Sequence, residues 1–80
     1  MTTSNQIRFA TAAQVSVARD CNDLLDVLRS RGELTSYRAA RIGFWMSGDT
    51  WSSRTRVLEN AGVIEQTGGI ENGCYVWRAT

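Results

Sequence analysis

The chain has 80 residues, with nine arginines, eight acidic residues and no lysine, histidine or proline, which leaves a formal net charge of +1. This length predicts a single domain, whose core buries only about 60% of the surface of the unfolded chain. No run approaches the roughly 20 apolar residues that span a bilayer. A hydrophobic content of 42% with 21% charged residues argues against disorder.

The composition also excludes several kinds of catalytic and metal site. Without histidine, His-based acid/base catalysis, Ser-His and Cys-His nucleophile pairs and Cys₂His₂ zinc sites are impossible. Cys21 and Cys74 are too few for a four-ligand metal site, and we expect two reduced, buried thiols, with a disulfide as the alternative. No glycine-rich phosphate loop and no converging acid/base pair is present, so the sequence predicts neither an enzyme nor a cofactor.

The N-terminal segment is polar. Residues 1–10 are expected to form a flexible arm, and Thr11 with Gln14 matches a capping box at the start of a helix. The polar stretch from Met1 to Gln6 is followed by no apolar region typical of a signal peptide, so we expect a cytoplasmic, reducing compartment.

The first predicted helix runs from 12 to 31 and ends at Gly32. Its weak helix formers leave open a break near Ser16. Apolar residues recur at spacings of three and four and therefore share one helical face. These residues are Ala13, Val17, Cys21, Leu24, Leu25 and Leu28.

A second, short helix is predicted just after Leu34. Either Thr35 or Ser36 can cap its N-terminus, because a hydroxyl accepts a hydrogen bond from a free backbone amide. Ala39 and Ile42, three positions apart, are expected to face the core, and Gly43 ends the helix.

The third predicted helix spans 51–61, capped by Asp49 or Thr50. Gly62 ends it. Before it, the Phe44–Met46 connection carries three large apolar side chains that we expect to fill the core. The inward stripe of the helix comprises Trp51, Thr55, Leu58 and Ala61, with the stem of Arg54 as the alternative to Thr55.

Two β-rich runs follow, at 63–67 and 74–78. Asn72-Gly73 between them favours a hairpin turn, because both residues tolerate positive φ. An isolated hairpin is marginally stable, so it must pack on the helices. Tyr75 and Trp77 alternate onto one face as the expected anchors, with an exposed, ligand-binding Trp77 as the alternative.

These elements predict an α+β, mostly helical fold. Two motifs add a resemblance: Leu34–Gly43 (LTSYRAARIG) and Thr50–Ile64 (TWSSRTRVLENAGVI). In order with the hairpin, they resemble the second helix, recognition helix and wing of winged helix-turn-helix DNA-binding domains of bacterial or phage regulators. The resemblance covers about residues 20–79. It implies that residues 11–80 form a three-helix winged helix-turn-helix domain with a C-terminal two-stranded β-hairpin wing.

The charges are distributed unevenly along the chain. Residues 29–56 carry six arginines against two acidic residues, or +4, whereas residues 1–28 and 57–80 sum to −1 and −2. Positive charge is therefore concentrated in the proposed helix-turn-helix, where DNA phosphates would need neutralising. An ordinary solvated face is the alternative explanation.

The resemblance also implies which residues contact DNA. A recognition helix presents its N-terminal residues to base edges, and an arginine fork can bond guanine O6 and N7 together. On this basis we expect Arg56 and Ser53 to read bases. The expected contacts to bases or phosphates from the third helix are Thr50, Ser52, Ser53, Arg54 and Arg56, and those from the second helix to backbone phosphates are Tyr37, Arg38 and Arg41.

Two functions follow from these observations. The first is a small sequence-specific protein that binds double-stranded DNA, either a repressor-like transcriptional regulator or a phage or mobile-element accessory factor. The second is a protein-interaction module, such as a phage-encoded inhibitor or adaptor that binds a host protein. Its support is the acidic wing (Glu65 and Glu71), the low net charge and the apolar Phe44–Met46 turn as an exposed hot spot. A homodimer through the first helix is left open.

Overall fold

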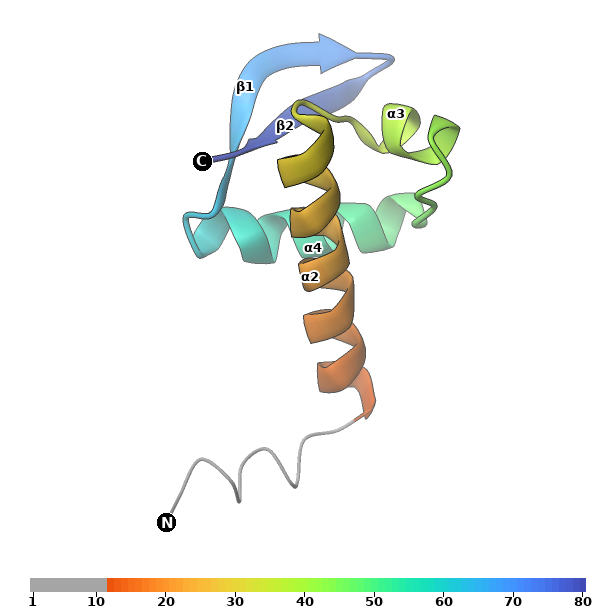
Figure 1. The fold of residues 1–80 in the computed structure, drawn as a ribbon, viewed down its shortest axis with the longest axis vertical. Coiled ribbons are helices and arrows are strands. Elements are labelled where there is room, and N and C mark those ends of the chain that lie inside the picture. The colour runs from red at the N-terminus through yellow and green to blue at the C-terminus, as the bar shows by residue number, and fades with distance from the viewer. Residues whose placement is uncertain (1–11) are drawn as a thin grey trace.

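A computed structural model describes residues 12–80 of the chain. Its elements are α2 (Ala12–Arg31), α3 (Ser36–Arg41), α4 (Gly48–Asn60), β1 (Ile64–Glu71) and β2 (Cys74–Ala79). The long helix α2 crosses α4, and the hairpin and α3 lie together at the C-terminal end of α2 (Figure 1). The α+β, mostly helical class is confirmed. The predicted arm and the Thr11 cap lie outside the described residues, and no helix within 12–80 is long and apolar enough to cross a membrane.

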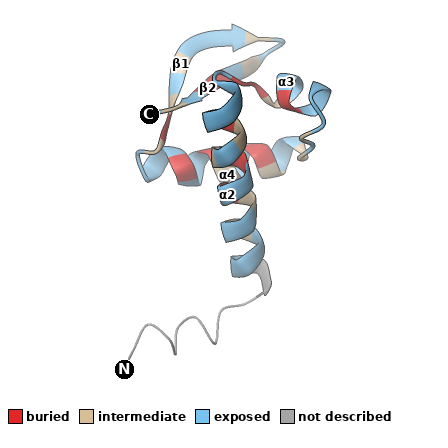
Figure 2. Ribbon diagram, in the orientation of Figure 1, coloured by how far each residue is buried: buried red, intermediate tan, exposed pale blue. Residues whose placement is uncertain are grey.

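The first helix is continuous, so the break considered near Ser16 does not occur. Cys21, Leu24 and Leu28 are buried in the core, as their spacing predicts, with Val17 packed more loosely against it. This end of α2 projects beyond the rest of the fold, and its residues 14–16 are exposed (Figure 2).

Thr35 caps α3, and its Oγ1 accepts a hydrogen bond of 3.1 Å from the backbone N–H of Arg38. Ala39 is buried as predicted. The expectation for Ile42 is wrong, because its side chain is 41% exposed. Ile42 is the C-cap of the helix, and its neighbours Arg41 and Gly43 are exposed as well, so this end of α3 is not covered by the core.

The third helix begins earlier than expected, at Gly48, and its N-cap is Ser47 rather than Asp49 or Thr50. The Ser47 Oγ accepts from the backbone N–H of Thr50 at 3.2 Å. Three of the four expected inward residues are buried, but Ala61 is exposed, because it lies at an uncovered helix end where Asn60 and Gly62 are exposed as well. The buried residues are Trp51, Thr55 and Leu58.

The Phe44–Met46 connection fills the core only in part. Phe44 and Met46 are half-buried and pack against the core, whereas Trp45 is 77% exposed, which contradicts the prediction for this residue. The connection is neither helix nor strand, and only Phe44 and Met46 are turned toward the core, while Trp45 between them is turned to the solvent.

The hairpin pairs β1 with β2 in antiparallel register, with Gln66 opposite Trp77. Its turn is the predicted one, with positive φ at both Asn72 (51°) and Gly73 (76°). β1 extends beyond the predicted 63–67 and reaches Glu71, with a register irregularity between Gln66 and Ile70.

Trp77 holds the hairpin on the helices. It is 5% exposed and belongs to the same core cluster as Leu24 of α2 and Leu58 of α4. Its backbone exchanges two hydrogen bonds of 2.9 Å with Leu34, which makes an isolated bridge between β2 and the α2–α3 connection. Tyr75, the second expected anchor, is 58% exposed, since it lies nearer the hairpin tip. Because Trp77 itself is buried, the alternative of an exposed, ligand-binding Trp77 is wrong.

Both cysteines are free thiols, so no disulfide forms between them. Cys21 is buried, as expected, and burial raises the pKa of its thiol, although nearby Arg54 partly opposes this. Cys74 is only half-buried, and its sulfur accepts a hydrogen bond from the Ser36 hydroxyl at 3.5 Å.

Trp77→Ala is expected to lower the free energy of unfolding by about 3–5 kcal/mol, because it removes a buried aromatic side chain from the core. The matched control is Tyr75→Ala on the same strand, which should change it by less than about 0.5 kcal/mol. Urea unfolding followed by far-UV circular dichroism measures both. Equal losses for the two variants would contradict Trp77 as the anchor.

Candidate nucleic-acid interface

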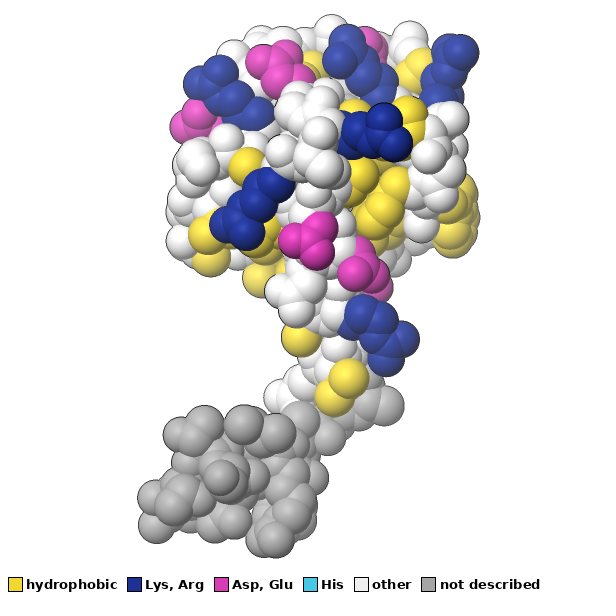
Figure 3. Space-filling model, in the orientation of Figure 1, with side chains coloured by type: hydrophobic (Ala, Val, Ile, Leu, Met, Phe, Trp, Pro, Cys, Tyr) yellow, Lys and Arg dark blue, Asp and Glu magenta, His cyan; other side chains and the backbone are white. Residues whose placement is uncertain are grey.

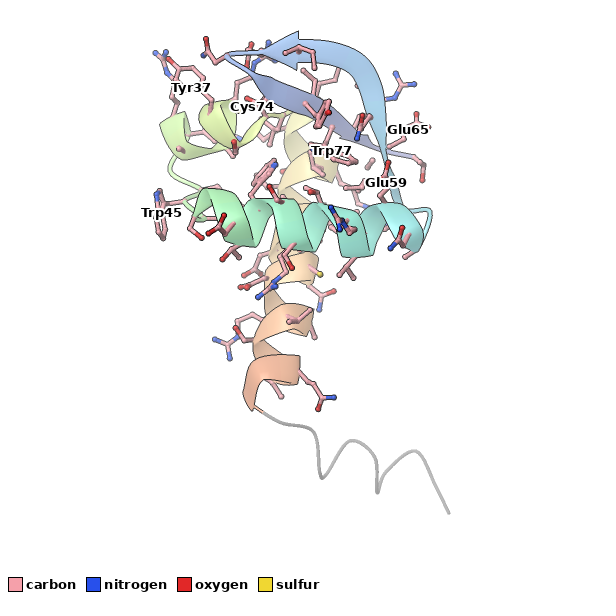
Figure 4. All side chains as sticks on the ribbon, turned by 180° about the vertical axis from the view of Figure 1, so that it is seen from behind. Tyr37, Trp45, Glu59, Glu65, Cys74 and Trp77 are labelled. Carbon is pink, nitrogen blue, oxygen red and sulfur yellow. The ribbon has the colours of Figure 1, made fainter. Side chains whose placement is uncertain are left out.

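The outer face of α4 is the surface that the sequence predicts to read DNA. Ser52, Ser53 and Arg56 are all exposed on it, away from the buried stripe of the helix. Seen from behind, α4 runs across the front of the molecule with no other element over it (Figure 4). Within the described residues Arg56 forms no ion pair, so its guanidinium is free to bind a ligand.

Arg54 is placed differently from Arg56. Its side chain is only 17% exposed, and its Nε donates to the Asp20 Oδ2 of α2 at 3.1 Å. Its Nη1 donates to the Ser53 hydroxyl at 3.2 Å. Arg54 therefore links α4 to α2 and orients Ser53.

Thr50 lies at the N-terminus of α4, as predicted, but it takes part in the cap. Its backbone N–H donates to the Ser47 Oγ, and its Oγ1 accepts from the Ser47 hydroxyl at 2.9 Å. Asp49 places a carboxylate in the same first turn. The positive end of the helix dipole is thus already partly balanced within the chain.

On α3, Tyr37 and Arg41 form one unit. The Arg41 Nη1 donates to the Tyr37 hydroxyl at 3.1 Å, and the guanidinium carbon lies 5.6 Å from the centre of the tyrosine ring. Both side chains are exposed, so the charge of Arg41 is available to solvent.

Arg38, the third residue predicted on α3, contacts the wing. Its Nη2 and Nε donate to the Glu71 Oε2 at 2.7 and 2.8 Å. The other carboxylate oxygen of Glu71 accepts from the Thr35 hydroxyl at 3.0 Å. The hydrogen bonds from Arg38 hold the pKa of Glu71 below its usual range and raise the pKa of Arg38. This Glu71 clamp (Thr35, Arg38 and Glu71) fastens the tip of the hairpin to α3.

The second acidic side chain of the wing is also paired. The Glu65 Oε2 accepts from the Arg78 Nε on the neighbouring strand at 2.7 Å. Both wing glutamates are therefore partly neutralised by arginines of the same chain. Sequence reasoning missed these partners because neither pair shares a helix, and only the strand register and the docked hairpin bring them together.

A groove of about 470 Å³ runs between α4 and the hairpin. Trp51 and Trp77 are among its lining residues, so the groove reaches the buried core. Arg56 and Glu59 of α4 line it with opposite charges. Polar and aromatic side chains of all three elements also line the groove, among them Ser52 of α4, Gln66 of β1, and Cys74 and Tyr75 of β2.

The positive charge of residues 29–56 is divided among the helices. Arg29 and Arg31 lie in the last turn of α2, while Arg38 and Arg41 lie on α3. On the exposed part of α4, Arg56 stands with the acidic residues Asp49 and Glu59. The face of α4 is therefore not strongly basic, and its candidate chemistry is local hydrogen bonding by Arg56 and two serines.

Comparison with protein-family models, curated proteins and solved structures finds no match for this chain. Within residues 12–80, three helices followed by an antiparallel hairpin are consistent with a winged-helix-like topology. In the part of the chain that the structure describes, no group of three or more acidic or cysteine side chains could hold a metal ion.

Glu71→Gln tests the clamp through its pH dependence. Because Arg38 lowers the pKa of folded Glu71, the charged carboxylate stabilises the fold above the ordinary pKa of the unfolded chain. This contribution disappears as the pH falls through the lowered pKa. The urea midpoint of the original chain should therefore exceed that of Glu71→Gln at neutral pH, and the two should converge in acid.

Glu65→Gln is the matched control, since it removes the other arginine-paired wing glutamate and leaves the contact with α3 intact. The urea midpoint of Glu65→Gln should still fall in acid as that of the original chain does, because Glu71 and its contact with Arg38 are unchanged. A midpoint difference between the original chain and Glu71→Gln that stays constant into acid would contradict the clamp.

Proposed function

We propose that this chain is a small sequence-specific protein that binds double-stranded DNA and reads the major groove with α4. The single observation that carries the proposal is the uncovered outer face of α4, where Ser52, Ser53 and Arg56 are exposed together. A winged helix-turn-helix of the repressor type, or a phage or mobile-element accessory factor, uses its recognition helix in this way. The free thiols Cys21 and Cys74 fit a cytoplasmic, reducing compartment.

In this proposal Arg56 is the main base-reading residue. Its guanidinium has no ion-pair partner within residues 12–80, so binding guanine breaks no existing contact. Ser53 adds a hydroxyl, held in place by Arg54. Arg54 itself supports α4 through Asp20 and keeps its Nη2 for a phosphate oxygen.

The backbone contacts come from two places in the proposal. Arg41 and Tyr37 on α3 offer a cation and a hydroxyl to phosphates, while Thr50 and Ser52 offer hydroxyls near the start of α4. Arg38 contributes its remaining donor beside the Glu71 clamp. On α3 and α4 only Arg41 and Arg56 have no ion pair within residues 12–80, so we expect a shallow dependence of affinity on salt, since the slope follows the number of neutralised phosphates.

A protein-interaction module remains the second candidate, because Trp45 is 77% exposed and tryptophan is enriched among interface hot spots. The acidic wing supports this candidate less than the sequence implied. Glu65 and Glu71 are both engaged by arginines of the same chain, so the wing offers less free negative charge to a basic partner.

Selection from random duplex DNA should enrich one motif. On that duplex, Arg56→Ala should weaken binding by about 1–3 kcal/mol, because it removes a bidentate base contact. It should leave the thermal midpoint unchanged, since Arg56 is exposed and unpaired. Gel-shift titration and thermal unfolding measure the two quantities.

Arg54→Ala tests the supporting role of Arg54 on the same helix and, unlike Arg56→Ala, should change stability. It should lower the free energy of unfolding by about 1–2 kcal/mol, because the partly buried Asp20 loses its partner. Arg41→Ala should weaken specific and non-specific binding alike and reduce the salt slope by about one. No enriched motif, or an Arg56→Ala variant that binds as tightly as the original chain, would overturn the proposal.

A further inference from the structure

A shallow hollow lies on the opposite side of the molecule from the outer face of α4. It runs between the C-terminal half of α2 and the chain after α3. Val27, Ile42 and Phe44 line it with apolar side chains, and Ile42 is substantially exposed. In Figure 3 this face shows an apolar patch beside α2, with an arginine above it and acidic side chains below it.

Charges of opposite sign flank the hollow along α2. Asp23 and Asp26 lie toward the middle of the helix, and Arg29 and Arg31 lie in its last turn. None of these four side chains forms an ion pair within the described residues. The surface is therefore apolar at its centre, acidic at one end and basic at the other.

The spacing of these residues makes the surface self-complementary. Asp23, Val27 and Arg31 follow one another at intervals of four, so they share one stripe of α2. Val27 stands midway between the acidic and the basic residue. A second α2 that runs antiparallel and is centred on Val27 would place each Asp23 opposite an Arg31.

We propose that this face of α2 is an isologous interface with a second copy of the chain. The two α2 helices pack antiparallel with their Val27 residues at the centre. Each helix also contacts the apolar side chains of Ile42 and Phe44 on the other copy. The two-fold axis generates two ion pairs, between Asp23 and the partner's Arg31 and the reverse. A parallel arrangement would instead bring like charges together, so the charge order selects the antiparallel one.

We assign a second copy of the chain to this surface because α2 is complementary to itself. Its acidic and basic residues lie at equal distances on either side of Val27. The interface leaves the outer face of α4 uncovered, since that face lies on the other side of the molecule (Figures 3 and 4). Dimer formation therefore stands apart from DNA binding, and it can be measured without DNA.

Sedimentation velocity over a series of protein concentrations should show a monomer–dimer equilibrium. The dimer should weaken as salt rises, because exposed ion pairs are screened. Asp23→Arg and Arg31→Asp should each raise the dimer dissociation constant by about tenfold or more, because two attractive pairs become two like-charge contacts. The double variant Asp23→Arg/Arg31→Asp should restore the dimer, since it only exchanges the partners.

Glu59→Arg is the control, because it reverses a charge on α4 and should leave the dimer unchanged. Circular dichroism checks that every variant is folded. A chain that is monomeric at every concentration would overturn the proposal. The hollow would then bind another protein or nothing. The proposal would also be overturned by a dimer that both single reversals retain, or by one that the double variant does not restore.

Discussion

The contact between Trp77 and Leu34 is the constraint on which the rest of the structure depends. The Trp77 side chain is buried in the core shared by α2 and α4, while its backbone is bonded to Leu34 in both directions. This fixes β2 against the connection that leads into α3. Thr35, the cap of α3, follows Leu34 directly, so the same contact places it within hydrogen-bonding distance of Glu71 at the hairpin tip.

The packing of the hairpin and helices also determines which arginines are bonded within the chain and which can bind a ligand. Arg38 is bonded to the wing, and Arg54 is bonded to α2 through Asp20. The segment charge of +4 therefore overstates the basic character of the surface that faces away from the core. Arg56 is the arginine of α4 whose charge is unshared, and it lies between two serines and the groove beside the hairpin. Specific hydrogen bonding, rather than a strongly positive field, is the chemistry this face offers.

Local sequence patterns predicted the helices and the hairpin. The exposure of single side chains and the pairing of charges depend on tertiary contacts, which these patterns do not contain. The stripe on α2, a hydroxyl cap at Thr35 or Ser36 and the Asn72-Gly73 turn depend on neighbours in sequence, so the sequence predicts them, and the structure selects Thr35 as the cap. Solvent exposure at the ends of elements depends on what covers them, so four residues were placed wrongly: Ile42, Trp45, Ala61 and Tyr75. The clamp on Glu71 joins residues far apart in the sequence, and no local signal announces it. The DNA contacts proposed for α4 remain predictions.

The central claim is that the outer face of α4 binds duplex DNA. The most direct measurement is an amide NMR titration of the labelled chain with duplex DNA. If α4 binds DNA, the largest amide shifts should occur at Ser52, Ser53 and Arg56, with smaller ones at Tyr37 and Arg41 on α3. Shifts absent from α4, or confined to the opposite face around Val27, would contradict the claim.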